Sequence, residues 1–328
     1  MHAQEKKYDD GDDIFFGKIV LNPELEKLRQ FMNLQVPQLC LTMPKHLQSP
    51  SILLLQRQYA GYSLINLKNF YDLFLPPVWT VIYWLHHNGA TLTRAELNTA
   101  AQGQAMAMLV HMLDDHLADA QLQVGHLILQ LRTRAWQVYE DSYRMLARNI
   151  TGGEKLAEEL IDVYFSGVHA PPVSECLEDY MELARKEMAT GLVIPMLIAS
   201  RIGNQIGIRQ SLESFGIAWR LGDDLKDWVM DAKTGQITAI FHKFSKESRI
   251  LWNSCKGMDD NAPEFGALYK HINENRVFDE LKFRVRAELE NASSVACELG
   301  LDGLASEYRT LAEPLKQLYE NTEVYPKY

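Results

Sequence analysis

The chain has 328 residues and a formal net charge of −10, with 47% hydrophobic and 23% charged residues. This composition excludes a wholly disordered chain, and the length is sufficient for a large buried core. The acidic balance argues against binding to nucleic acid, because phosphate backbones are themselves anionic. The four cysteines form no CxxC pair, so neither a structural zinc site nor a disulfide framework is expected.

The acidic N-terminus, MHAQEKKYDDGDDIFF, has no apolar segment typical of a signal peptide. No apolar run approaches the ~20 residues that span a bilayer, so we expect no stable membrane insertion and a cytoplasmic protein. We interpret residues 1–20 as a flexible acidic tail. Residues 21–328 contain no linker or internal repeat and are predicted to form a single α-helical domain.

Apolar residues at helical spacing dominate from about residue 22, which predicts an all-α fold. Thr93 and Glu96 have the spacing of a capping box, so a helix is predicted from 93 to about 119. Small residues fill its first half and indicate close packing against a neighbouring helix. Further helices are predicted over about 126–148, 154–167, 174–201, 210–231, 262–298 with a break inside, and 302–320. Pro195 is expected to kink the helix that contains it.

Two aspartate-rich segments end long, mostly apolar helices: LDDHLAD at 113–119 and GDDLKDWVMD at 222–231. Asp115 and Asp119 share a helix face because they are four residues apart. Asp223, Asp227 and Asp231 form a column with the same spacing. Like charges at this spacing weaken a helix, and the C-terminal end of a helix disfavours anions. A local conflict of this kind is typical of a functional site.

Divalent cations would resolve the conflict between these carboxylates. Mg²⁺ prefers oxygen ligands and is commonly shared between carboxylates and substrate phosphates. Two facing acidic columns therefore predict a small Mg²⁺ cluster, with Mn²⁺ as an alternative, that neutralises a diphosphate leaving group. A solvated acidic face is the alternative for either segment alone. His111 and His116 leave a mixed His/Asp transition-metal site open, although the Glu-x-x-His pairs of a di-iron bundle are absent from the sequence.

The paired aspartate motifs resemble those of class I isoprenoid synthases, which include trans-prenyl diphosphate synthases and class I terpene cyclases. The match is best over FGIAWRLGDDLKDWVMDAKTGQ at 215–236, and EMATGLVIPML at 187–197 resembles the kinked helix of those synthases. There is also some similarity to moenomycin-type prenyltransferases. The resemblance implies a helical bundle around a deep apolar cavity, with three Mg²⁺ ions and a diphosphate at its mouth. It also implies a homodimer.

The resemblance assigns metal ligation to the residues that match the two motifs: Asp114, Asp115, Asp119, Asp223, Asp224, Asp227 and Asp231. Within this set, Asp115, Asp119, Asp223 and Asp227 are expected to be catalytic, together with Arg220. Diphosphate release needs polar or basic partners, and a carbocation cavity needs aromatic walls. The residues expected to bind substrate are Arg185, Lys186, Thr190, Phe215, Trp219, Lys226, Lys233, Tyr308 and Arg309.

The sequence departs from chain-elongating synthases where they hold isopentenyl diphosphate. The early Gly-Lys-x-x-Arg segment is reduced to Lys68, and the Arg-Arg pair after the first motif is replaced by the distant Arg132 and Arg134. A second diphosphate would therefore miss its cationic partners. We expect a terpene synthase that ionises one linear prenyl diphosphate, about C15 to C25, and then cyclises or quenches the carbocation. Two alternatives are prenyl transfer to an acceptor other than isopentenyl diphosphate, and a non-catalytic helical binding protein.

Overall fold

A computed structural model of the chain describes residues 16–59, 66–118, 121–170, 175–259 and 262–320. All regular secondary structure in these segments is helical, which confirms the predicted all-α class. The elements are α1 (Pro23–Leu41), α2 (Lys45–Tyr59), the 3₁₀ segment η1 (Asn66–Leu73), α3 (Pro77–His87), α4 (Arg94–Ala118), α5 (His126–Ala147), α6 (Gly153–Val168), α7 (Leu177–Glu187), α8 (Ala189–Ser200), α9 (Gln205–Thr234), α10 (Ala239–His242), α11 (Lys246–Ser254), α12 (Pro263–Glu274), α13 (Val277–Glu298) and α14 (Asp302–Glu320).

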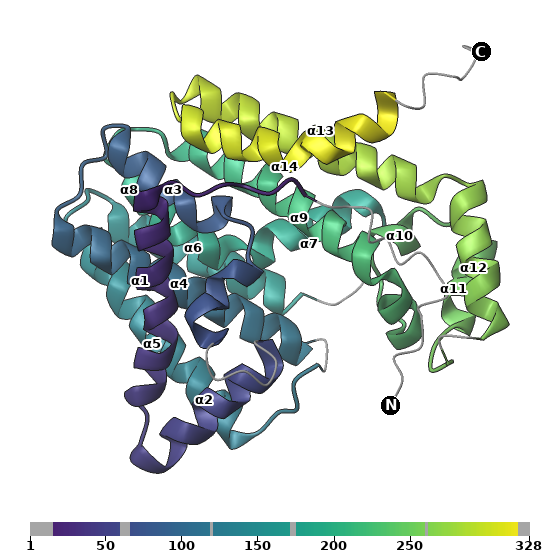
Figure 1. Cartoon of the computed structure of the whole chain (residues 1–328), viewed down its shortest axis with the longest axis horizontal. Helices are drawn as coiled ribbons and strands as arrows, with labels where there is room; N and C mark the ends of the chain where they lie inside the picture. The colour runs from purple at the N-terminus through teal and green to yellow at the C-terminus, as the bar shows by residue number, and fades with distance from the viewer. Residues whose placement is uncertain (1–15, 60–65, 119–120, 171–174, 260–261, 321–328) are drawn as a thin grey trace.

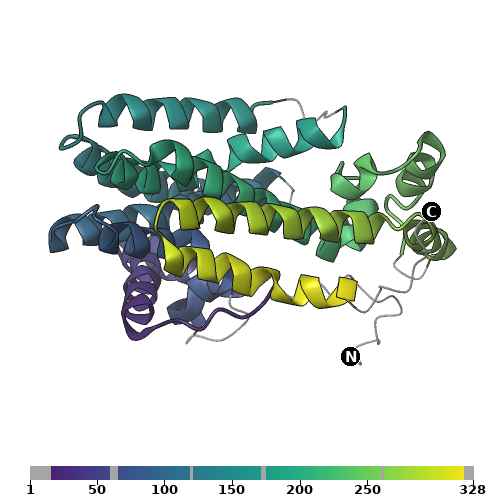
Figure 2. The same ribbon diagram turned by 90° about the horizontal axis from the view of Figure 1, so that it is seen from above.

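The two helices that carry the aspartate segments, α4 and α9, are both packed against α8. Helix α9 also lies along α13, and α13 and α14 run side by side in opposite directions (Figures 1 and 2). One continuous cluster of buried side chains extends from Leu25 on α1 to Leu315 on α14. Helix α8 is buried at nearly every position, so it fixes the spacing between the two acidic helices.

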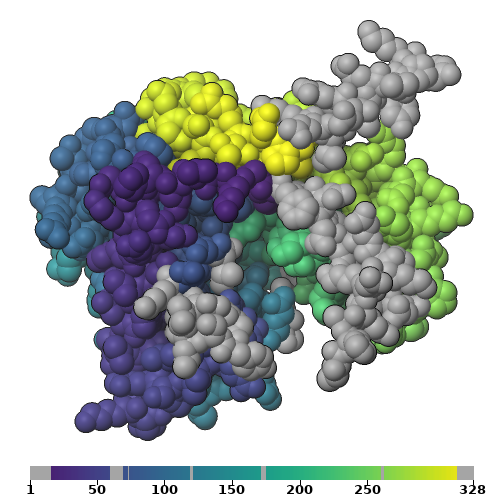
Figure 3. Space-filling model, viewed as in Figure 1, coloured from purple at the N-terminus to yellow at the C-terminus, as the bar shows by residue number. Residues whose placement is uncertain are grey.

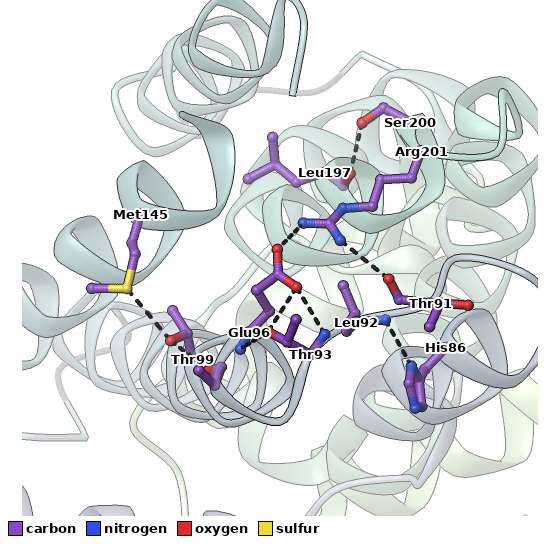
Figure 4. Close-up of polar contacts among 11 residues, drawn as sticks. His86, Thr91, Leu92, Thr93, Glu96, Thr99, Met145, Leu197, Ser200 and Arg201 are labelled. Carbon is purple, nitrogen blue, oxygen red and sulfur yellow. Dashed lines mark hydrogen bonds and ion pairs between the residues drawn. The ribbon is translucent and has the colours of Figure 1, made fainter. Parts of the chain in front are cut away.

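The N-terminus of α4 is held by the predicted capping box, which the structure confirms. The Thr93 amide donates to Glu96 Oε2 at 2.8 Å, and the Glu96 amide donates to Thr93 Oγ1 at 3.2 Å. Arg201, which follows α8, donates to the second oxygen of Glu96 and to the Thr91 carbonyl (Figure 4). The hydrogen bond from Arg201 and those from Thr93 lower the pKa of Glu96 to about 2. The start of α4 is thus anchored to the end of α8.

The helix predicted around Pro195 is interrupted, but not at the proline. The segment predicted as one helix over 174–201 consists of α7 and α8, which are separated at Met188, while Pro195 lies inside α8. A proline removes the donor that would serve the carbonyl four residues earlier, here that of Gly191. Gln104 on α4 donates its Nε2 to this carbonyl at 3.1 Å. Because a neighbouring helix satisfies the Gly191 carbonyl, α8 continues through the proline.

The predicted flexible tail over residues 1–20 lies mostly outside the described residues. Its described end is docked, in contrast to the prediction, and runs along α14 (Figure 1). The amide of Gly17 donates to the Leu311 carbonyl at 3.1 Å. A Cβ added to Gly222 on α9 would lie 2.8 Å from the Phe16 ring, so this glycine lets the segment pack closely. The segment therefore belongs to the helical body.

Close packing of the first half of α4, predicted from its small residues, gives a stability test. A Cβ at Gly103 would lie 2.8 Å from Ile194 Cδ1 and 2.9 Å from Ser142 Cβ, whereas a Cβ at Gly191 meets nothing within 4 Å. We expect Gly103→Ala to lower the free energy of unfolding by roughly 1–3 kcal/mol through overpacking. Gly191→Ala, its matched control, should raise it by about 0.5–1 kcal/mol because alanine favours the helix. Urea denaturation measures both, and equal effects of the two substitutions would contradict the packing described.

Candidate functional site

An apolar pocket lies between α4, α8 and α9, and it encloses about 500 Å³ of space, including the solvent at its opening. It is lined by Phe74, Val78, Ala107, Met108, His111, Met188, Gly191, Leu192, Leu212, Phe215, Gly216 and Trp219. Small residues on all three helices leave this room. At Gly191 in particular, the place of a side chain is empty out to 4 Å. The pocket can therefore take a flexible apolar chain.

The apolar pocket opens into a polar mouth. This mouth is a second pocket that shares five lining residues with the apolar pocket, so the two form one continuous cavity. The shared residues are Phe74, His111, Met188, Gly216 and Trp219. The mouth adds mainly polar and charged side chains: Tyr59, Met112, Asp115, His116, Ala184, Glu187, Arg220 and Asp223. Asp115 comes from α4 and Asp223 from α9, so each aspartate-rich helix contributes a carboxylate to the same opening.

Arg220 connects the two aspartate-rich helices across the mouth. Its Nη1 lies 3.5 Å from Asp115 Oδ1 on α4, and its Nε lies 3.5 Å from Asp224 Oδ1 on its own helix. Arg220 Nε also donates to the Tyr180 hydroxyl at 2.7 Å, and the guanidinium stands 5.7 Å from the centre of that ring. The electrostatic interaction with Tyr180 and those with the carboxylates of Asp224 and Asp115 outweigh burial, which alone would lower the pKa of Arg220, and raise that pKa well above its usual value. A fixed positive charge therefore stands among the acidic groups.

The carboxylate of Asp224 is used in hydrogen bonds that hold the fold together. This carboxylate is buried, accepts the Tyr180 hydroxyl at 2.9 and 2.8 Å, and accepts the Ala239 amide at 2.9 Å. These bonds join α9 to α7 and to the start of α10. The arrangement does not support the expected role of Asp224 as a metal ligand, because its two oxygens already have partners in the protein.

Asp114 is likewise held away from the cavity. Arg132 on α5 donates to it through Nε at 2.9 Å and Nη2 at 2.7 Å, and the Tyr164 hydroxyl on α6 donates to the same carboxylate. Asp114 lines neither pocket. Because neighbouring helix positions point about 100° apart, Asp114 turns toward α5 and α6 while Asp115 turns into the mouth.

The other carboxylates of the second motif, those of Asp223, Asp227 and Asp231, lie in a column along α9. Desolvation by the surrounding walls and repulsion by Asp227 raise the pKa of Asp223 to about 6, although solvent reaches the side chain. Asp231 is buried at the end of the column, and desolvation followed by repulsion from Asp224 raises its pKa to about 8. Asp227 is exposed between them. Asp119, the last member of the first motif, lies outside the described residues.

Oxygen ligands at this mouth suit a hard divalent cation, but they are not preassembled. In the described segments, no three His, Cys, Asp or Glu side chains come together as a metal site. This disfavours the mixed His/Asp alternative, which needs a complete protein ligand set. It fits Mg²⁺, which typically takes one or two carboxylates and completes its shell with water and substrate phosphate. Asp115 and Asp223 are the carboxylates placed for that role.

The expected substrate-binding residues divide into two groups. Phe215 and Trp219 line the cavity. Tyr308 instead packs beneath Phe215, with ring centres 5.5 Å apart, in the buried core. Thr190 is fully buried, and its carbonyl accepts the Tyr139 hydroxyl at 2.8 Å. Of the residues expected to bind substrate, all of which the structure describes, seven line neither pocket: Arg185, Lys186, Thr190, Lys226, Lys233, Tyr308 and Arg309.

Several cavity residues were not among those expected to bind substrate. His111, which the sequence offered only for the mixed His/Asp alternative, lines both pockets and lies four residues before Asp115 on the same helix face. His116 lines the mouth, and its Nδ1 is 2.9 Å from the Tyr59 hydroxyl. Tyr59 and Glu187 reach the mouth from α2 and α7, and no spacing in the sequence places them there.

No protein-family model matches the sequence, and no match was found among curated proteins. Its fold is similar to solved structures of prenyl diphosphate synthases. Geranylgeranyl pyrophosphate synthase from Lactobacillus brevis is 12% identical with a TM-score of 0.62, and the match covers 89% of this chain and 96% of that one. A decaprenyl diphosphate synthase from Rhodobacter capsulatus is 14% identical with a TM-score of 0.58, over 87% and 96% of the two chains.

A third similar structure is geranylgeranyl pyrophosphate synthase from Corynebacterium glutamicum, complexed with isoprenyl diphosphate and magnesium. It is 15% identical with a TM-score of 0.51, over 88% of this chain and 99% of that one. Likeness at such low identity shows the fold. The chain therefore has the all-α isoprenoid synthase fold that the motifs predicted, and its activity must be argued from the site.

The buried end of the α9 column predicts a pH effect in the metal-free protein. The pKa of Asp231 is about 8 when folded and about 3.9 when unfolded. The folded state thus holds the extra proton, so this contribution to stability is complete below about pH 4 and is lost as the pH rises through 8. We expect Asp231→Asn to be more stable than the wild type at pH 8.5 and to flatten the slope of unfolding free energy between these limits. Urea denaturation across pH, with exposed Asp141→Asn as control, tests this; an unchanged slope contradicts it.

Proposed function

We propose that the chain is a divalent-metal-dependent prenyltransferase that joins an allylic prenyl diphosphate to an acceptor and releases diphosphate. The observation that carries this proposal is the single cavity whose apolar interior opens between Asp115 and Asp223. A prenyl diphosphate has the matching division into an apolar chain and an anionic head. The similar structures are prenyl diphosphate synthases, and one of them holds isoprenyl diphosphate and magnesium.

Transfer is better supported than the terpene cyclisation that the sequence favoured. Each of the similar structures described above is of an enzyme named for making a prenyl diphosphate, and none is named as a cyclase. The departures in the sequence argue against prenyl transfer only where the acceptor is isopentenyl diphosphate. Prenyl transfer was the first alternative, and it is the function that we adopt.

Asp115 and Asp223 would hold the cations, with Asp227 beside them on the α9 column. Bound Mg²⁺ would supply Lewis-acid neutralisation of the diphosphate as its bond to the prenyl carbon breaks. The number of ions, three by family resemblance, and the use of Mn²⁺ belong to the same proposal. Metal is needed at this mouth because, without bound cations, the carboxylates of Asp115, Asp223 and Asp227 would repel the anionic head of the substrate.

Arg220 would bind the diphosphate from the side of α9. Among the described side chains that line the two pockets, it is the one with a permanent positive charge. Its bond to Tyr180 fixes Nε, so the outer nitrogens are left to point across the mouth. One arginine matches one metal-bound diphosphate. A second diphosphate would need further cations, and we therefore propose an acceptor that does not carry one.

The apolar pocket would bind the prenyl chain. Phe74, Phe215 and Trp219 supply aromatic faces in this pocket, which favour positive charge that develops on an allylic carbon. Phe74 and Trp219 meet edge to face with ring centres 5.9 Å apart, so both rings are held in place. This wall also keeps water from the reacting carbon, as transfer to an acceptor requires.

Substrate incubation tests the proposal. The full chain, with Mg²⁺ and C15, C20 or C25 allylic diphosphate, should release diphosphate when a hydroxyl or aromatic acceptor is added, and the joined product is identified by mass spectrometry. Asp115→Asn and Asp223→Asn should each lower kcat by about 100-fold or more, because each removes a charge that holds the metal. Asp141→Asn on α5, an exposed control of the same chemistry, should leave the rate within about twofold.

The products separate the alternatives. A hydrocarbon or alcohol formed from the allylic diphosphate alone would return the function to terpene synthesis, and a longer diphosphate formed with isopentenyl diphosphate would assign chain elongation. Absence of turnover with every acceptor, together with unchanged Mg²⁺–pyrophosphate binding in Asp115→Asn, would contradict the enzyme and leave a binding protein.

A further inference from the structure

One region of this acidic protein is free of acidic residues. The chain has 43 Asp and Glu residues, but none lies between Glu26 and Asp72, and none lies between Asp119 and Glu140. The first stretch contains the whole of α2, and the second contains the start of α5. These two helices pack against each other, so the two acid-free stretches meet in space. The Lys and Arg residues of these two stretches have no acidic neighbour within either stretch, in a protein of net charge −10.

Apolar side chains are exposed on the same surface. A groove between α2 and α5 is lined by Pro50, Leu53, Leu54, Arg57, Gln58 and Leu127. Leu53 is 51% exposed, and Val124 and Leu129, which flank Leu127 in sequence, are 66% and 45% exposed. Helix α2 and the start of α5 lie together at the lower end of the molecule in Figures 1 and 3. We name this surface, formed by Lys45, Leu53, Arg57, Val124 and Leu129, the α2–α5 face.

We propose that the α2–α5 face binds the surface of an anionic lipid bilayer. Exposed leucine and valine side chains can enter the boundary between headgroups and acyl chains, while Lys45 and Arg57 pair with lipid phosphates. The absence of carboxylates from both stretches removes the repulsion that the rest of the protein would meet at such a surface. In the described segments no helix is long and apolar enough to cross a membrane, so the contact is peripheral.

The charge of the face also argues against a second copy of the chain as its partner. In a two-fold symmetric dimer the same patch meets itself, so Lys45 and Arg57 would face like charges across the interface. With no carboxylate in either stretch, neither cation would gain a partner from the other copy. An anionic surface offers the complementary charge that another α2–α5 face does not.

The α2–α5 face lies close to the cavity opening, so a bilayer bound there would be near the proposed substrate site. Tyr59, the last residue of α2, lines the mouth that holds Asp115 and Asp223. A bilayer docked on α2 therefore lies beside the cavity opening. If the cavity takes prenyl chains, as proposed above, substrates that partition into the bilayer would reach it over a short path. Vesicle binding itself requires no turnover and is measured independently of the prenyltransferase activity.

Sedimentation of the full chain with vesicles tests this assignment. We expect binding to phosphatidylcholine vesicles that contain 30% phosphatidylserine, roughly tenfold weaker binding to phosphatidylcholine alone, and loss of binding in 0.5 M NaCl. The double variant Lys45→Glu/Arg57→Glu should lower the partition coefficient for the anionic vesicles at least about tenfold. Leu53→Asn should lower it severalfold, because it removes an inserting apolar group.

Matched variants keep the test specific. Lys155→Glu/Lys270→Glu makes the same change in net charge at exposed positions on α6 and α12, and Ile206→Asn removes an exposed apolar residue from the start of α9. These controls should bind as the wild type does, and thermal denaturation confirms that every variant is folded. The assignment is overturned if the wild type binds neither vesicle, or if the control pair reduces binding equally. It is also overturned if Lys45→Glu/Arg57→Glu splits a dimer while vesicle binding is unchanged.

Discussion

The guanidinium of Arg220 is the interaction on which the site depends. It stands between a carboxylate of α4 and a buried carboxylate of α9, and Tyr180 fixes its orientation from α7. Without a cation at this place, the two acidic helix ends would face each other across the mouth with their charges uncompensated. Arg220 therefore supplies, in the protein alone, part of the positive charge that we propose metal ions to supply at this mouth. In the proposed function it would also bind the anionic head of the substrate.

In each Asp-Asp pair, one carboxylate is bound within the fold and the other lines the mouth of the cavity. In the first pair, Asp114 is bound by Arg132 and Asp115 enters the mouth; in the second, Asp224 is bound by Tyr180 and Asp223 enters the mouth. The division follows from helix geometry, because adjacent positions point about 100° apart and only one can face a given cavity. The bound partner holds the helix in position, so the carboxylate beside it keeps a defined direction toward the opening.

Part of the fold could be predicted because its signals are local. Hydrophobic spacing located most helices from α4 onward, but it gave no ranges for α1, α2, α3, α10 and α11. The Thr93–Glu96 pair located the start of α4, and the small residues around Gly103 indicated a close helix contact. The partners of the aspartates could not be predicted in this way. Arg132 is 18 residues from Asp114 and Tyr180 is 44 residues from Asp224, so only the tertiary packing joins them. The same limit explains Tyr308, whose aromatic character fits a cavity wall but whose ring lies in the core. The homodimer implied by the resemblance stays a prediction.

A crystal structure of the full chain with Mg²⁺ and a non-hydrolysable prenyl thiodiphosphate tests the central claim most directly. We expect a diphosphate group at the mouth, with Asp115 and Asp223 on its metal ions and the prenyl chain between α4, α8 and α9. Arg220 should have left Asp115 for a phosphate oxygen while its bond to Tyr180 persists. A diphosphate bound away from this mouth, or metal ions held by Asp114 and Asp224 with Arg132 and Tyr180 displaced, would contradict the account.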